Sequence, residues 1–346
     1  MLKTTLEQLP RLFAAIAAKR QLYMPVKNDD NKSKFTLWRD GVEADLDSLL
    51  TARSAKDFFF LPSEVLAHFT TCGQNISIEP VPVDTREFVL FGVRPCDAKS
   101  LEILDKVFLS QPVDSFYQNR RELGVIISLS CAAPEETCFC DLFGIDAASP
   151  MGDIALWPDG DQLFWLPQSA KGQELTDDLS GFFTAADAAD RQKLTEIKKQ
   201  TAKILGRLPL RELKLPEFAG DAQEKAFNAA VWERLSAVCL GCGACTYVCP
   251  TCHCYDICDF DAGGKTERFR CWDSCMYSDF TNMAHGNPRK SGMERFRQRF
   301  MHKLVYFPRN NEGAYACVGC GRCLNICPVN LNITKVARTL GGDDSV

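Results

Sequence analysis

The chain has 346 residues, which is long enough for two domains and for at least one sizeable buried core. Its formal net charge of −5 and its pI near 5.6 argue against a general nucleic-acid binder. Eighteen cysteines in a large chain without a secretion signal indicate thiolate–metal chemistry in a reducing compartment rather than a disulfide framework.

The first twenty residues predict an amphipathic helix rather than a signal peptide. Leu9, Leu12 and Ile16 fall on one helical face, and charged residues interrupt every apolar run. No stretch reaches the length needed to cross a bilayer, since residues 58–61 form only a short apolar core segment. We therefore expect a cytoplasmic protein with no membrane partner.

Residues 1–215 predict a mixed α/β domain, because short apolar runs rich in β-branched residues alternate with helical patterns. The predicted elements are strands at 88–93 and 124–130, a helix at 98–110 between them, a hairpin at 154–166, a helix at 187–205 and a linker at 209–220. If the first two strands are parallel neighbours, the residues that follow them leave the same edge of the sheet, where α/β proteins place their ligands.

Residues 216–346 contain two copies of the pattern Cys-x2-Cys-x2-Cys-x3-Cys-Pro. This is the spacing of bacterial ferredoxins, in which three close thiolates bind one [4Fe–4S] cluster and the cysteine before proline ligates the other cluster. The predicted ligands are Cys239, Cys242, Cys245 and Cys327 for cluster 1, and Cys317, Cys320, Cys323 and Cys249 for cluster 2.

Glycines within both cysteine runs allow the backbone to fold tightly around a cluster. They are Gly241, Gly243, Gly319 and Gly321. The alternative is a pair of structural zinc sites, but zinc needs four ligands at each site and does not require this register of cysteines and proline. We therefore expect iron–sulfur clusters.

A sixty-six-residue insert, 251–316, separates the two runs. A compact bacterial ferredoxin has no room for such an insert. The insert lacks strong strand patterning, and residues 293–304 within it predict a helix. The expected fold class is α+β, with the mixed α/β domain followed by an α-helical ferredoxin domain in which helices frame two [4Fe–4S] clusters.

Four cysteines of the N-terminal domain suggest a third cluster. Cys96 follows the first predicted strand and Cys131 follows the second, with Cys138 and Cys140 close behind. Four thiolates that converge at one sheet edge could hold a third [4Fe–4S] cluster. The alternative is that they are small buried residues, since free cysteine is among the most buried residue types.

Five more cysteines lie in the insert, at spacings that match no iron–sulfur run. They are Cys252, Cys254, Cys258, Cys271 and Cys275. One interpretation is packing against the ferredoxin domain. The other is a separate site that joins three of these cysteines to a histidine, namely Cys252, Cys254 and Cys275 with His285 or His302.

The insert is also basic, and two interpretations of its charge stay open. It would form either a surface that docks an acidic partner or an ordinary solvated helix face. The basic residues are Lys265, Arg268, Arg270, Arg289, Lys290, Arg295, Arg297, Arg299, Lys303 and Arg309. The chain has no GxGxxG after a strand, no GxxxxGK[ST] and no recognisable array of catalytic histidines, so we predict no nucleotide site and no catalytic residues.

Several short sequences resemble one known family over most of the chain. They are residues 91–97 (FGVRPCD), 114–122 (DSFYQNRRE), 137–140 (TCFC), 249–254 (CPTCHC), 272–275 (WDSC) and 301–304 (MHKL). With the two cysteine runs, they make the chain similar to the iron–sulfur subunits of anaerobic sulfite reductase and of sulfhydrogenase, where this is the β subunit. The family pattern includes the N-terminal cysteines.

The resemblance implies a role in electron transfer. Family members relay electrons between two other subunits, one that contains flavin and oxidises NAD(P)H, and a terminal catalytic one. The terminal one is a sirohaem sulfite reductase or a [NiFe] hydrogenase. We therefore expect a non-catalytic electron-transfer subunit. The alternatives are a self-contained iron–sulfur reductase that uses the extra cysteines, or a nucleic-acid-binding module stabilised by its clusters.

Overall fold

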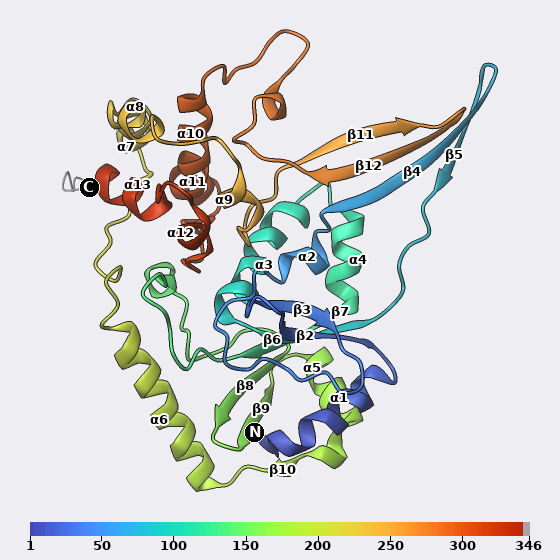
Figure 1. Cartoon of the computed structure of the whole chain (residues 1–346), viewed down its shortest axis with the longest axis vertical. Helices are drawn as coiled ribbons and strands as arrows, with labels where there is room; N and C mark the ends of the chain where they lie inside the picture. Colours follow the sequence, from blue (N-terminus) through green and yellow to red (C-terminus); the bar gives the residue numbers. More distant parts are fainter. Residues whose placement is uncertain (342–346) are drawn as a thin grey trace.

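The computed structural model describes residues 1–341 in three parts (Figure 1). An α/β body occupies the lower half of the view, a group of short helices lies above it on the left, and a narrow sheet projects to the upper right. None of the helices in this range is long and apolar enough to cross a membrane.

An eight-stranded mixed sheet forms the centre of the body, in the order β10–β1–β9–β8–β7–β6–β2–β3. The four central strands, β8, β7, β6 and β2, are parallel, and the outer pairings are antiparallel. The bounds are β1 Leu2–Thr5, β2 Gln21–Lys27, β3 Ser33–Leu37, β6 Phe88–Val93, β7 Gly124–Leu129, β8 Ile154–Asp159, β9 Gln162–Pro167 and β10 Thr184–Ala185.

Helices cover both faces of this sheet because its central strands carry apolar side chains on both sides. Every residue of β6 and β7 is buried, as expected for parallel strands between two helical layers. Two helices pack on one face, three on the other, and the long α6 lies against Trp157 and Phe164. The bounds are α1 Leu9–Ala17 and α5 Ala170–Asp178, then α2 Lys56–Phe59, α3 Pro95–Phe108 and α4 Ser115–Leu123, and α6 Ala188–Leu205.

The predicted elements of the body are confirmed except at the N-terminus. The two buried strands, the helix between them, the hairpin and the charged helix all form, with their ends shifted by a few residues. The predicted N-terminal helix is wrong in its first half, because β1 pairs with both β9 and β10. Only α1 carries the amphipathic pattern, and sheet pairing overrides the helical preference before it.

The cysteine runs lie among seven short helices around an apolar core that includes Trp232, Phe296 and Phe300. The bounds are α7 Asp221–Phe227, α8 Val231–Ser236, α9 Ala244–Tyr247, α10 Gly292–Met301, α11 Phe307–Asn310, α12 Arg322–Ile326 and α13 Ile333–Leu340. The helix predicted in the insert is confirmed as α10, which begins at a capping box between Ser291 and Glu294. A π-helical turn, His302–Tyr306, continues it into α11.

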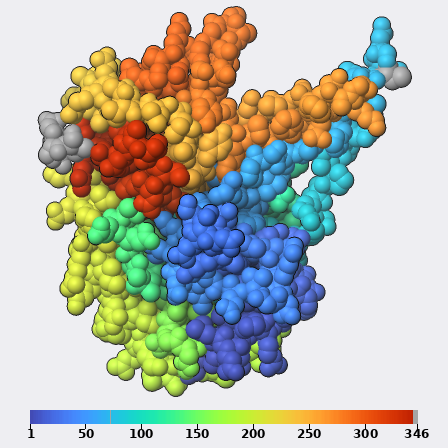
Figure 2. Space-filling view, in the orientation of Figure 1, coloured from blue at the N-terminus to red at the C-terminus, as the bar shows by residue number. Residues whose placement is uncertain are grey.

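The projecting arm is a four-stranded antiparallel sheet in the order β11–β12–β4–β5 (Figures 1 and 2). Its bounds are β4 Ser63–Cys72, β5 Asn75–Pro80, β11 Tyr255–Asp261 and β12 Lys265–Trp272. The expectation of an insert without strands is wrong, because β11 and β12 both come from it. Their partner β4 lies far away in the sequence, so no local pattern reveals the sheet.

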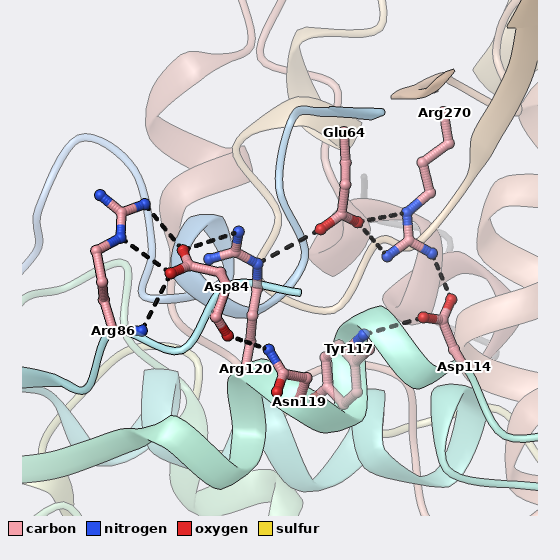
Figure 3. Close-up of polar contacts among 8 residues, drawn as sticks. All are labelled: Glu64, Asp84, Arg86, Asp114, Tyr117, Asn119, Arg120 and Arg270. Atoms are coloured by element: carbon pink, nitrogen blue, oxygen red, sulfur yellow. Dashed lines mark hydrogen bonds and ion pairs between the residues drawn. The ribbon is translucent and has the colours of Figure 1, made fainter. Parts of the chain in front are cut away.

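A buried ion-pair network fastens the arm to the body (Figure 3). Arg270 of β12, whose side chain is 3% exposed, donates to Glu64 of β4 at 2.6 Å and to Asp114 at the start of α4. Arg120 contacts Glu64 at 3.5 Å and Asp84 at 3.9 Å. One arginine thus joins both halves of the arm to the helix layer, and its charge is balanced by two carboxylates.

Candidate metal centre

Four cysteines from the two runs line one cavity in the helical part. They are Cys239, Cys242, Cys245 and Cys327, and the empty space between them is about 420 Å³. The first three lie between α8 and α9 or within α9, and Cys327 directly follows α12. The structure therefore brings together the four residues predicted for cluster 1, including the one from the other run.

Backbone groups next to this cavity suit a bound thiolate. The amide of Leu331 donates to Sγ of Cys327 at 3.2 Å, and such bonds to ligand sulfurs stabilise negative charge on a cluster. Gly243 has a φ of 72°, and a Cβ at this position would lie 2.6 Å from the Tyr277 hydroxyl. That hydroxyl donates to the carbonyl of Cys242 at 3.1 Å, so the close approach requires glycine.

The second predicted set, Cys249 with Cys317, Cys320 and Cys323, is also together. Burial raises the pKa of Cys317 to about 12, and a thiolate at Cys249 adds to that rise while Lys303 opposes it. Burial likewise raises the pKa values of Cys320 and Cys323, and Cys249 contributes to both. Cys249 therefore faces all three cysteines of the second run.

The four N-terminal cysteines gather at the carboxyl edge of the central strands. Cys96 lies in the first turn of α3 after β6, and Cys131 follows β7, its parallel neighbour. Cys138 and Cys140 join them from the next loop, and all four are buried in one apolar cluster that also contains Cys320. The N-terminal group and the second run therefore adjoin each other.

Two glycines make this close approach possible. Gly319 and Gly321 have φ values of 59° and 77°. A Cβ on Gly319 would clash with the carbonyl of Phe139, and one on Gly321 would lie 2.7 Å from Oγ1 of Thr137. The amide of Phe139 donates to the carbonyl of Gly319 at 3.0 Å, so the two cysteine-bearing loops touch through their backbones.

The cysteines of the insert separate into two places. Cys258 and Cys271 lie on the arm strands β11 and β12, away from the runs, while Cys252 lies beside Cys249 and Cys254 beside Cys275. A hydrogen bond from Cys275 lowers the pKa of Cys254 to about 7.

The histidines predicted as partners for these cysteines lie in different settings. His285 is exposed, and the His302 ring packs against His253 at 5.4 Å. Between residues 1 and 341, no three His, Cys, Asp or Glu side chains form a site for a single metal ion.

Three buried cations surround the two runs, and the sequence did not identify them as part of the site. Lys303 donates to Oγ1 of Thr251 and to the carbonyl of Ala316, both at 2.9 Å, and Lys56 donates to the carbonyl of Cys252 at 3.0 Å. Arg299 lines the first cavity. Within the described part of the chain, none of the three forms an ion pair with a carboxylate.

These cations fit anionic thiolates. Burial opposes the charge of Lys303, but thiolates at Cys249 and Cys252 outweigh burial and raise the pKa of Lys303 above its usual value. Burial lowers the pKa of Lys56 to about 8, which leaves most of its amines protonated at neutral pH. Since a buried charge is costly unless it is compensated, the donor set favours a group that carries net negative charge.

The predicted basic surface of the insert is wrong for three of its residues. Arg270, Arg299 and Lys303 are 3–4% exposed, so they lie inside the protein and cannot contact a docked partner. A signal for two of them was present in the sequence. Arg299 and Lys303 follow Phe296 by three and seven residues, which places all three on the same, apolar face of a helix.

Comparison with known proteins agrees with this geometry. A family model described as a 4Fe-4S dicluster domain matches residues 238–331, which span both cysteine runs and the insert. The chain is 34% identical over 336 residues to sulfhydrogenase 2 subunit beta of Pyrococcus furiosus, and the match covers 95% of each chain. No solved structure matches significantly. The predicted resemblance is confirmed, and the chain belongs to the family of iron–sulfur electron-transfer subunits that includes the sulfhydrogenase β subunit.

Proposed function

We propose that this chain relays single electrons between two other subunits, one that contains flavin and oxidises NAD(P)H, and a terminal catalytic one. The terminal one would be a [NiFe] hydrogenase or a sirohaem sulfite reductase. The observation that carries the proposal is the contiguity of the cysteine groups. Cys320 of the second run shares one apolar cluster with all four N-terminal cysteines, and Arg299 lies between the first cavity and Cys323.

Two [4Fe–4S] clusters would be held by the cross-paired sets. Cluster 1 takes Cys239, Cys242, Cys245 and Cys327, and cluster 2 takes Cys317, Cys320, Cys323 and Cys249. The shared cavity, the glycine turns and the buried cations support this assignment. Each cluster, when bound, supplies a one-electron store whose charge the surrounding residues stabilise.

The dicluster part would be an α-helical ferredoxin domain that begins near residue 216. The position of the first run between α8 and α9 supports a helical frame, as does the position of α12 between two ligands of the second run. The strands of the insert do not flank the runs but belong to the arm.

A third [4Fe–4S] cluster would be held by the N-terminal group of Cys96, Cys131, Cys138 and Cys140. Burial raises the pKa values of all four thiols, to about 12 for Cys138 and Cys140, so their thiolates need a bound cation. The alternative of inert packing predicts no iron at this position.

The test is to purify the full chain anaerobically and to count iron, acid-labile sulfide and electrons. We expect about eight to twelve irons per chain, with one electron taken up from dithionite for each assembled cluster and returned to free flavin mononucleotide. An iron-free or zinc-loaded preparation, or iron that takes up no electrons, would contradict the proposal.

A further inference from the structure

Arg299 is a buried cation without a partner among the described residues. It lies on α10, is 4% exposed and lines the cavity between the four cysteines of cluster 1. Its Nε, fully buried, has no hydrogen-bond acceptor within residues 1–341. A buried guanidinium with an unsatisfied donor is destabilising, so this position requires an anionic acceptor that the protein itself does not supply.

The surroundings of Arg299 strengthen its electric field. Phe296, Met276 and Leu331 line the same cavity, and the Arg299 guanidinium carbon lies 4.4 Å from the centre of the Phe300 ring. In such apolar surroundings a charge acts over a longer distance than it does in water. Burial opposes the charge, but thiolates at Cys245 and Cys323 outweigh it and raise the pKa of Arg299 above its usual value.

The other buried cations near the runs are engaged elsewhere. Arg322 forms two hydrogen bonds to Asp97, so its charge is neutralised by a carboxylate. Lys303 donates to Thr251 and Ala316, and the thiolates nearest to it are those of Cys249 and Cys252. Arg299 is therefore the uncompensated charge at cluster 1.

We propose that Arg299 raises the reduction potential of the cluster bound by Cys239, Cys242, Cys245 and Cys327, through its fixed positive charge and its N–H donors. The inference rests on the proposed function, since it needs a cluster in that cavity. Reduction adds one electron to a group that is already anionic, and a nearby cation stabilises the added charge. Cluster 1 would then hold the electron more strongly than its thiolate ligation alone predicts.

The experiment compares R299Q and R299K with R297Q as a matched control. Arg297 lies on the same helix, and its contacts are to the exposed Phe227 rather than to the cavity. An EPR-monitored redox titration of the iron-loaded chains should show one cluster in R299Q whose reduction equilibrium has moved at least tenfold toward the oxidised form. A tenfold change corresponds to about 59 mV for one electron.

R299K keeps the charge and should recover most of this shift, and R297Q should leave every cluster unchanged. A fully iron-loaded R299Q with native potentials would overturn the role of Arg299 and leave the proposed relay intact. An iron-free native chain would instead overturn the proposed function itself.

A second measurement applies even if R299Q fails to assemble. In the native chain labelled with 15N-arginine, pulsed EPR of the reduced protein should detect a nitrogen coupled to a cluster, and labelled R299K should lose that coupling. Absence of the coupling in the native chain, or its persistence in R299K, would contradict the inference.

Discussion

Asp97 and Arg322 form a buried ion pair with two hydrogen bonds, of 2.5 Å and 2.7 Å. Asp97 directly follows Cys96 at the edge of the large sheet, and Arg322 lies between Cys320 and Cys323 of the second run. Both side chains are less than 5% exposed. The pair therefore fixes the N-terminal cysteine group against the second run, although the two segments lie at opposite ends of the sequence.

D97N tests this pair. The substitution leaves the Arg322 guanidinium buried without its counterion, and loss of one partner from a buried pair costs about 3–5 kcal/mol. The measurement is anaerobic urea unfolding of the iron-loaded chain. D259N is the matched control, because Asp259 pairs with Arg268 on the arm while both are nearly half exposed, so water screens the pair and its loss should change stability far less. Equal effects of the two substitutions would refute the role of the buried pair.

Cross-ligation of the clusters makes C327S and C242S equivalent. Both substitutions should remove or alter cluster 1, so the reduced proteins should show the same remaining EPR spectrum. C249S should in turn resemble C320S, which affects cluster 2. If C327S instead resembles C320S, each run binds its own cluster and the cavity shared by Cys242 and Cys327 has another purpose.

The proposed third cluster predicts a loss of iron in C140S. This variant should contain about four irons fewer than the native chain, because one cluster lacks a ligand. C258S is the control, since Cys258 lies on the arm and should retain all the iron. Native iron content and native EPR spectra in C140S would show that the N-terminal cysteines are packing residues.

His302 predicts a dependence of stability on pH. Burial lowers the pKa of His302 to about 3, and His253 and Lys303 lower it further, whereas the unfolded side chain titrates near 6.5. As pH falls from about 6.5, the unfolded chain binds a proton that the folded chain does not. Native stability should then decrease by up to about 1.4 kcal/mol per pH unit from this group.

H302F removes this proton uptake. Its free energy of unfolding should therefore rise relative to that of the native chain as the pH is lowered from 7 to 5.5, in anaerobic urea titrations. Parallel curves for the two proteins would show that His302 does not titrate differently in the folded and unfolded states.

The elements that sequence predicted correctly are those whose signals are local. Strands β6 and β7 are uninterrupted apolar runs, and α3 between them repeats leucines at helical spacing, so composition and periodicity suffice. Strand β1 and the arm were missed because distant partners determine them. β12 pairs with β4, for example, and Arg270 of β12 meets Glu64 across 206 positions of sequence.

The same distinction applies to the candidate site. The spacing of the cysteines is a local signal, and it predicted which residues gather around the first cavity. The charges that accompany them could not be assigned, because arginine and lysine in a sequence usually indicate solvent. Only the folded chain shows that Arg299 and Lys303 point inward with the phenylalanines of the same helix.

The arm has a consequence for how the protein is made. Its strands β4 and β5 leave the ribosome early, but their partner β12 is synthesised only after the first cysteine run. Through that interval, the ten residues of β4 present an open hydrogen-bonding edge, which is a template for aggregation. A two-stranded hairpin is only marginally stable, so translation that stops before residue 265 would release a chain prone to self-association. The insert between the cluster runs is thus also the segment that completes and protects the N-terminal half.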